Sequence, residues 1–282
     1  MKVVEVENLS FTYAGAAKPA LTDVSLQVEA GEFVLIAGPS GGGKSTLCRC
    51  LNGLVPQFYE GDYRGRVVVD GLEADKTPIH VLSQHVGMVF QNPHNQLFSL
   101  SVESDIAFPL ENLGLPRDEI RKRVDEALQI MRIEDLRDRS PFELSGGQQQ
   151  RVAIASVLAM QPKIIVMDEP TSYLDPLSAM NLFKMIDYVR EKLGLTVLLV
   201  EHRVDLAVAR ASRILVVSDG QVVYDGPPRE FFMQHNPHLY GVSIPKVVKL
   251  SAGMKKAMAG WSRVCVSPEE FEQEVRRIGR GF

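Results

Sequence analysis

The chain has 282 residues, a formal net charge of −4, 45% hydrophobic residues and 23% charged residues. Its length allows one large domain or two smaller ones, and its composition is that of an ordinary globular protein. The slightly acidic balance gives no support to nucleic-acid binding, and three cysteines do not suggest a disulfide framework. No apolar stretch approaches the roughly 18 residues that a membrane-spanning helix needs. We therefore expect any work at a membrane to depend on a partner chain.

Short apolar stretches at the start of the chain predict β-structure. Residues 3–11 alternate with a period of two, and residues 21–28 and 66–69 look like further strands. Residues 32–37 form an apolar run that is typical of a buried strand. Tyr13 ends the first strand. Its ring could either pack there or stack on a nucleotide base, because an aromatic face suits any π-system.

A glycine-rich loop connects the strand at residues 32–37 to a predicted helix at residues 47–52. The loop reads G-x-x-x-x-G-K-S, the pattern of phosphate-binding loops, and a chance match is on the order of one in a hundred. Glycines let backbone amides approach phosphate oxygens, and the helix start attracts anions. Lys44 would reach the β- and γ-phosphates, and Ser45 would offer a hydroxyl to Mg²⁺. The predicted nucleotide-binding residues are Gly38, Pro39, Ser40, Gly41, Gly42, Gly43, Lys44, Ser45 and Thr46.

The middle of the chain predicts a helical insert between strands. Residues 86–90 form a short apolar strand, and Gln91 follows it as a candidate ligand for a metal or a water, although such a residue alone is more often a solvated loop residue. We expect Pro109 and Pro116 to interrupt the apolar segment that comes next. Apolar residues then recur at helical spacing over residues 120–131, with charges on the opposite face.

A second helix start suited to an anion comes next, in the stretch Leu144-Ser145-Gly146-Gly147-Gln148. Ser145 is a natural helix N-cap, and the two glycines leave backbone amides bare. This pentapeptide should arise by chance in well under one chain in a thousand.

The pairing of this stretch with the phosphate loop resembles the ATP-binding cassette (ABC) ATPases, and later motifs follow in that family's order. Residues 164–170 look like its second nucleotide motif, an apolar strand that ends in Asp168 and Glu169. Residues 172–175, which end at Asp175, resemble its D-loop, and residues 197–202 resemble the strand leading to its switch histidine. The resemblance covers about residues 3–230.

The resemblance implies a role for each residue of these motifs. Asp168 would hold Mg²⁺ through water, and Glu169 would orient or deprotonate the attacking water. His202 would sense the γ-phosphate, Gln91 would be the Q-loop glutamine, and Tyr13 would stack on adenine. The catalytic set is thus Lys44, Gln91, Glu169 and His202, and the metal set is Ser45, Gln91 and Asp168.

The resemblance implies two nucleotide-binding chains that are arranged head to tail. Ser145 and Gly147 of one chain would complete the γ-phosphate site over Lys44 of the other, so that ATP holds the pair closed and hydrolysis lets it part. The residues that would bind nucleotide besides the phosphate loop are Tyr13, Ser145, Gly146, Gly147, Gln148 and Asp175.

Residues 90–98 resemble the Q-loop of the energy-coupling-factor importers, which take up vitamins, cobalt or nickel. The segment Glu201-His202-Arg203 departs from the more usual Thr-His-Asp of the family but keeps the histidine. Near the end, residues 267–270 form a capping box with a proline at the first helical position. This tail resembles the branch's C-terminal extension, which pairs with its mate; the alternative is a surface helix folded on its own domain.

We therefore expect an α/β P-loop domain with a mainly parallel core sheet and an N-terminal antiparallel β portion. It would span residues 1–235, with a helical insert at about residues 92–160, and a helical extension would follow at residues 236–282. The expected function is an ATPase subunit of an importer, peripheral on the cytoplasmic side of the membrane. Its partners would be a second ABC ATPase chain, like or unlike, a transmembrane coupling subunit and a substrate-binding membrane subunit, but no nucleic acid. The alternatives are a soluble ABC ATPase of DNA repair or translation, another importer branch, and a regulatory cassette that does not hydrolyse ATP.

Overall fold

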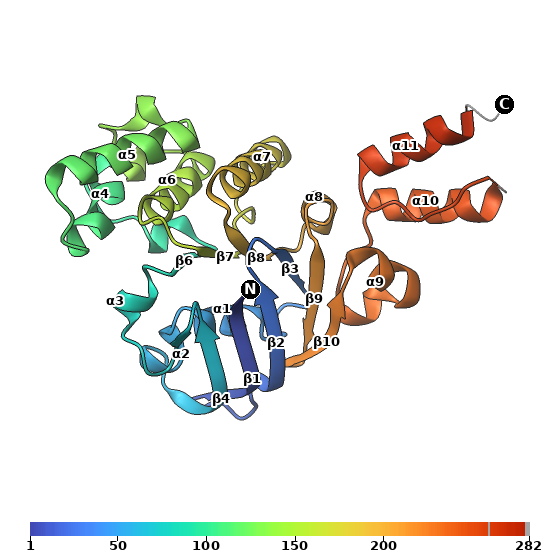
Figure 1. Cartoon of the computed structure of the whole chain (residues 1–282), viewed down its shortest axis with the longest axis horizontal. Coiled ribbons are helices and arrows are strands. Elements are labelled where there is room, and N and C mark those ends of the chain that lie inside the picture. The colour runs from blue at the N-terminus through green and yellow to red at the C-terminus, as the bar shows by residue number, and fades with distance from the viewer. Residues whose placement is uncertain (259, 280–282) are drawn as a thin grey trace.

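Strands and helices follow one another along the whole chain, as the colours of Figure 1 trace. The computed structural model describes residues 1–258 and 260–279. The strands are β1 (Lys2–Tyr13), β2 (Leu21–Glu29), β3 (Phe33–Ala37), β4 (Gly61–Val69), β5 (Leu72–Glu73), β6 (Val86–Val89), β7 (Ile164–Asp168), β8 (Thr196–Val200), β9 (Arg213–Ser218) and β10 (Gln221–Gly226). The helices are α1 (Lys44–Leu51), α2 (Leu54–Gln57), α3 (Ile79–Leu82), α4 (Val102–Asn112), α5 (Arg117–Met131), α6 (Gly146–Ala159), α7 (Pro176–Leu193), α8 (Val204–Ala207), α9 (Pro228–Gln234), α10 (Lys246–Ala257) and α11 (Pro268–Gly279). Short 3₁₀ turns lie at Pro93–Asn95, Glu134–Leu136, Pro141–Glu143 and Pro237–Tyr240.

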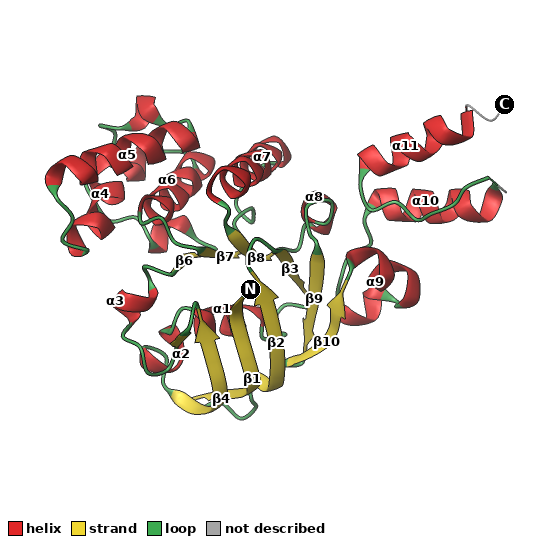
Figure 2. Ribbon diagram, viewed as in Figure 1, coloured by secondary structure: helices red, strands yellow, loops and turns green. Residues whose placement is uncertain are grey.

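Two sheets form the centre of the molecule (Figure 2). The first is antiparallel, with the strand order β2-β1-β4-β5. The second, which we call the core sheet, has the order β10-β9-β3-β8-β7-β6. Its neighbouring strands run parallel except for the hairpin of β9 and β10. This arrangement confirms the predicted fold, a mainly parallel core sheet with an N-terminal antiparallel β portion.

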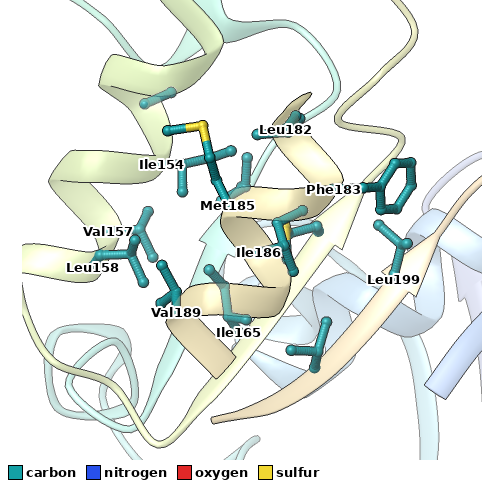
Figure 3. Packing of buried hydrophobic residues seen from close by; sticks show 14 of the residues in the cluster. Ile154, Val157, Leu158, Ile165, Leu182, Phe183, Met185, Ile186, Val189 and Leu199 are labelled. Carbon is teal, nitrogen blue, oxygen red and sulfur yellow. The ribbon is translucent and has the colours of Figure 1, made fainter. Parts of the chain in front are cut away.

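The side chains of β3 alternate between two hydrophobic cores, one on each face of the core sheet. Phe33, Leu35 and Ala37 pack in the core shared with helices α4 to α7, whereas Val34 and Ile36 pack in the core shared with β1, β2 and α1. Figure 3 shows the first of these cores, where side chains of α6 and α7 meet those of β7 and β8. Because both faces of the sheet are covered, its central strands are continuous apolar runs in the sequence.

Parallel pairing brings the C-terminal ends of β3, β7 and β8 to one edge of the core sheet. Val200, the last residue of β8, pairs with Ile36 on one side and with Asp168 on the other. The phosphate loop therefore begins at the same edge at which β7 ends in Asp168. Ligands of open α/β sheets bind outside this edge, so the fold itself gathers the predicted motifs there.

The segment between β6 and β7 is largely helical, and α4 and α5 both pack on α6. Our expectation that Pro109 would break this segment was wrong, because Pro109 lies inside α4. The helix continues for a further turn, with the N–H of Leu113 donating to the carbonyl of Pro109 at 3.2 Å. Ile106 and Leu110 are fully buried on this helix, and their burial offsets the hydrogen bond that a proline cannot make. Pro116 does mark a boundary, as the N-cap of α5.

At the C-terminal end, α10 and α11 lie side by side and project away from the core sheet (Figure 1). As predicted, α11 begins at Pro268, and the hydroxyl of Ser267 accepts from the N–H of Glu270 at 3.2 Å. The carboxylate of Glu270 contacts Arg229 of α9 at 2.5 Å, which ties the extension to the domain. Residues 280–282 of the predicted extension lie outside the described residues. Within residues 1–258 and 260–279, no helix combines the length and the apolar character needed to cross a membrane.

Candidate active site

The phosphate loop requires glycine at two positions because its backbone lies close to other segments. Gly38 has a φ of 141°, and a Cβ atom there would lie 2.0 Å from the carbonyl oxygen of Val217 in β9. Gly43 has a φ of 105°, and a Cβ atom there would lie 2.6 Å from the carbonyl oxygen of Ala20. Both are conformations that residues with side chains rarely adopt. The loop is thus held between β9 and the connection from β1 to β2.

Lys44, the first residue of α1, points its ammonium group back into the loop. The side chain is buried, and Nζ donates to the carbonyl oxygens of Gly38 at 3.0 Å and Pro39 at 2.7 Å. Burial lowers the pKa of Lys44, while the negative charges of Glu169 and Asp168 act in the opposite direction. The positive charge therefore lies between the loop and the two acids that follow β7.

Ser45 and Asp168 place two oxygens next to each other where the loop meets β7. The Ser45 hydroxyl donates to the Asp168 carboxylate at 3.1 Å. Burial raises the pKa of Asp168, and the hydrogen bond from Ser45 opposes that rise. A hydroxyl and a buried carboxylate are oxygen ligands of the kind that Mg²⁺ prefers, so the residues fit the predicted cation.

Glu169 contacts three side chains through its carboxylate. One oxygen lies 2.9 Å from Nε2 of His202, and the other accepts from the Gln91 amide at 2.8 Å and the Ser172 hydroxyl at 3.0 Å. Its backbone has a φ of 49°, a left-handed conformation that is uncommon outside glycine. Strain of this kind is concentrated at functional sites. The structure thus brings Gln91, Glu169 and His202 together, and their roles in hydrolysis stay predictions.

Ser172, which lies in the stretch that resembles the D-loop, is a further member of this cluster that no motif had indicated. The only local signal was its position three residues after Glu169, where its N–H donates to the Glu169 carbonyl at 3.1 Å and closes a turn. This turn places the Ser172 hydroxyl next to the Glu169 carboxylate.

Tyr13 lies beside the start of α1. Its hydroxyl is 3.1 Å from the Thr46 hydroxyl and accepts from the guanidinium of Arg49, also at 3.1 Å. Its ring meets Phe11 and Tyr59 edge to face, with centroid distances of 4.8 Å and 6.1 Å. Arg49 and Tyr59 were not singled out from the sequence. The stacking of Tyr13 on a base stays a prediction.

The second predicted helix start is capped by its own side chains. The Ser145 hydroxyl accepts from the N–H of Gln148 at 3.4 Å, and the Gln148 side chain accepts from the N–H of Ser145 at 3.0 Å. Ser145 is exposed. Within residues 1–258 and 260–279, no further hydrogen bond engages the amides of Gly146 and Gly147, and none joins this segment to the phosphate loop of the same chain. The amides that would meet an anion are therefore those of the two glycines.

Asp175 caps α7, accepting from the N–H groups of Leu177 at 2.9 Å and Ser178 at 3.0 Å. A hydrogen bond from the Ser178 side chain has the largest effect in lowering the pKa of Asp175, and the two backbone N–H groups lower it further. In the described structure Asp175 is a helix cap, and its contact with nucleotide stays a prediction.

Comparison with known proteins agrees with this geometry. A family model described as ABC transporter matches residues 21–172. A protein of Pyrococcus abyssi, described only as an ABC transporter ATP-binding protein, is 43% identical over 278 residues, which are 98% of this chain and 99% of the relative. The energy-coupling factor transporter ATP-binding protein EcfA1 of Ligilactobacillus salivarius is 40% identical over 255 residues, 90% of this chain and 88% of the relative.

Solved structures give the same result. CbiO1 from Clostridium perfringens, part of the ABC transporter complex CbiONQ, has a TM-score of 0.74 at 38% identity and covers 83% of this chain and 91% of its own. A dimeric ATP-binding cassette in a post-hydrolysis state, bound to ADP and phosphate, has a TM-score of 0.70 at 33% identity and covers 80% of this chain and 99% of its own.

Proposed function

This chain belongs to the ABC transporter family and is an ATPase of that family, and we propose that it powers an energy-coupling-factor importer for a vitamin or a transition metal ion. The likeness to EcfA1 and to CbiO1 supports this branch. The observation that carries the catalytic assignment is the Glu169 carboxylate, held between Gln91 and His202 at the edge where the phosphate loop begins.

Each residue at this edge has a part in hydrolysis. The loop amides and Lys44 bind the β- and γ-phosphates of ATP. Ser45, Asp168 and Gln91 would hold Mg²⁺, which would supply positive charge to neutralise the phosphate oxygens. Glu169 orients or deprotonates the attacking water, and His202 contacts the γ-phosphate. Tyr13 stacks on adenine.

A second ATPase chain, identical or related, completes the site. The exposed Ser145 and the free amides of Gly146 and Gly147 suit an anion that is bound by another chain. With Gln148 and Asp175 they would close over the nucleotide on the partner's Lys44. The dimeric cassette with ADP and phosphate supports this arrangement.

A membrane partner would dock on an apolar groove of about 260 Å³ beside the insert. Phe98 is 57% exposed, and its ring meets that of Phe108 edge to face, with a centroid distance of 4.6 Å. Contiguous exposed apolar surface beside a groove is typical of interaction sites. The occupant would be an apolar helix of the transmembrane coupling subunit, with the substrate-binding membrane subunit beyond it. The chain would then be peripheral on the cytoplasmic side of the membrane.

Purification of the full chain from membranes tests this proposal. Apolar membrane chains should co-purify with the wild type. Replacement of both Phe98 and Phe108 by Ser should abolish this co-purification without loss of ATP hydrolysis. Met233→Ser is the control, since Met233 is 52% exposed on α9, which does not line the groove. Turnover stimulated by DNA or ribosomes, with no membrane chain recovered, would instead favour a soluble ABC ATPase.

A further inference from the structure

The residues on either side of His202 form hydrogen bonds to the segment that follows Glu169. Glu201 is only 2% exposed, and its carboxylate accepts from the Thr171 hydroxyl at 2.6 Å. The other oxygen of the same carboxylate accepts from the N–H groups of His202 at 2.8 Å and Arg203 at 2.9 Å. A buried carboxylate needs such donors, because it is otherwise unfavourable in a low-dielectric interior.

Arg203 makes a second connection to the same segment. Its guanidinium donates to the backbone carbonyl of Leu174 at 2.8 Å. Leu174 is buried and directly precedes Asp175, the cap of α7. This bond constrains the position of the Leu174 carbonyl, and therefore of the chain that enters α7.

Three successive residues thus contact three points along one short segment. Glu201 bonds Thr171, His202 lies against Glu169, and Arg203 bonds Leu174. We call this set of contacts the switch ladder. Its two outer contacts depend on the glutamate and the arginine by which this chain departs from the more usual residues around the switch histidine.

We propose that Glu201 and Arg203 are positioning residues, which hold His202 in register with Glu169. Because they also bond the segment that enters α7, a shift of that segment would move the histidine. Movement of Asp175 on closure with a second chain would then reach the site of hydrolysis through the backbone of residues 171–174. The inference rests on the proposed role of His202. It assigns a function to the two residues beside the histidine that differ from the more usual Thr and Asp.

Steady-state ATP hydrolysis by the full chain tests the ladder. Arg203→Met keeps the length of the side chain but removes its donors, and we expect kcat to fall about tenfold with the KM for ATP changed less than about twofold. Arg203→Lys retains a donor and should recover part of kcat. Thr171→Val should also lower kcat, and when it is combined with Arg203→Met the loss should be smaller than the product of the single losses, because both break one ladder.

Arg210→Met is the matched control. Arg210 also ties the region after β8 to α7, donating to Asp187 at 2.7 Å and to the Leu206 carbonyl at 2.6 Å, but it does not touch the ladder. We expect it to lower the Tm about as much as Arg203→Met does while kcat stays at the wild-type value. If Arg203→Met lowers the Tm but leaves kcat unchanged, the ladder is only structural and the inference is wrong.

His202→Ala separates this outcome from a failure of the proposed function. If that variant retains full turnover, the assigned role of His202 is wrong and the inference is overturned with it. If His202→Ala abolishes turnover while Arg203→Met and Thr171→Val do not change it, only the ladder is refuted.

Discussion

Nε2 of His202 lies 2.9 Å from one carboxylate oxygen of Glu169, whose other oxygen accepts from the amide of Gln91. These three residues follow the ends of three different strands, β8, β7 and β6. The parallel order of the core sheet brings them to the same edge, so the site depends on correct assembly of the sheet more than on any local motif.

Glu169→Gln should retain ATP binding and lose most of its turnover. The amide preserves the shape of the side chain but cannot accept a proton, and general bases contribute about 10²–10⁴-fold to rate. Phosphate release and nucleotide binding measured on the same preparation would separate the two effects. Glu191→Gln is the control, an exposed acid on α7 that should leave both unchanged. Hydrolysis at the wild-type rate by the Glu169 variant would refute the assigned role.

Tyr13→Ala should weaken ATP binding more than Tyr13→Phe does. If the ring stacks on the base, its loss removes about 1–3 kcal/mol of binding free energy, whereas Phe keeps the stacking surface and loses only the contacts to Thr46 and Arg49. Calorimetric titration with ATP would measure both. Equal weakening by the two variants would assign the effect to the hydroxyl and contradict stacking.

Gly38→Ala should destabilise the fold and abolish nucleotide binding. The new Cβ would overlap the carbonyl oxygen of Val217, a backbone atom that cannot move aside without shifting β9. We expect a loss of several kcal/mol in the free energy of unfolding, as for other forced overlaps. Gly41→Ala is the control, because its φ of 76° is also left-handed but no atom lies within 4 Å of its Cβ position. The free energy of unfolding of this variant, measured by thermal unfolding, should fall by only about 1 kcal/mol.

The C-terminal extension should loosen in acid. Bonds from Arg277 and from the backbone and hydroxyl of Ser262 lower the pKa of Glu274 to about 2. Because this pKa is below the ordinary value of 4.5, the contribution of Glu274 to stability is present above pH 4.5 and is lost as the pH falls toward 2. Glu274→Gln should remove this pH dependence.

Trp261 is a built-in reporter for this transition. It is the single tryptophan of the chain, is only 4% exposed, and packs on Phe271 of α11 with a ring-centroid distance of 4.9 Å. Its fluorescence should therefore follow the release of α11 in the wild type. A fluorescence change at the same pH in Glu274→Gln would show that other carboxylates control the transition.

The sequence predicted the core sheet and the phosphate loop because both depend on local patterns. Buried strands are continuous apolar runs, and the glycines of the loop are required by the conformations that it adopts. The local prediction of a helix break at Pro109 was wrong, because the burial of Ile106 and Leu110 outweighs the hydrogen bond that the proline removes.

Contacts between distant segments that no motif connects could not be predicted. Thr171 and Glu201 are separated by 30 positions, and no periodicity or motif connects them. Tyr59 and Arg49 likewise surround Tyr13 only because β1 and β4 pair and lie beside α1. The candidate functional residues were thus identified from motifs, whereas the residues that contact them and hold them in position were not.

The family model that matches this chain ends at residue 172, yet the backbone that encloses the phosphate loop extends to residue 220. Gly220 donates to the carbonyl of Gly42 at 3.0 Å and accepts from the N–H of Thr22 at 2.8 Å. A fragment cut at the end of the matched stretch would carry the whole glycine-rich motif and lack one wall around it. We therefore expect that a piece of this chain able to bind a triphosphate must include the turn between β9 and β10.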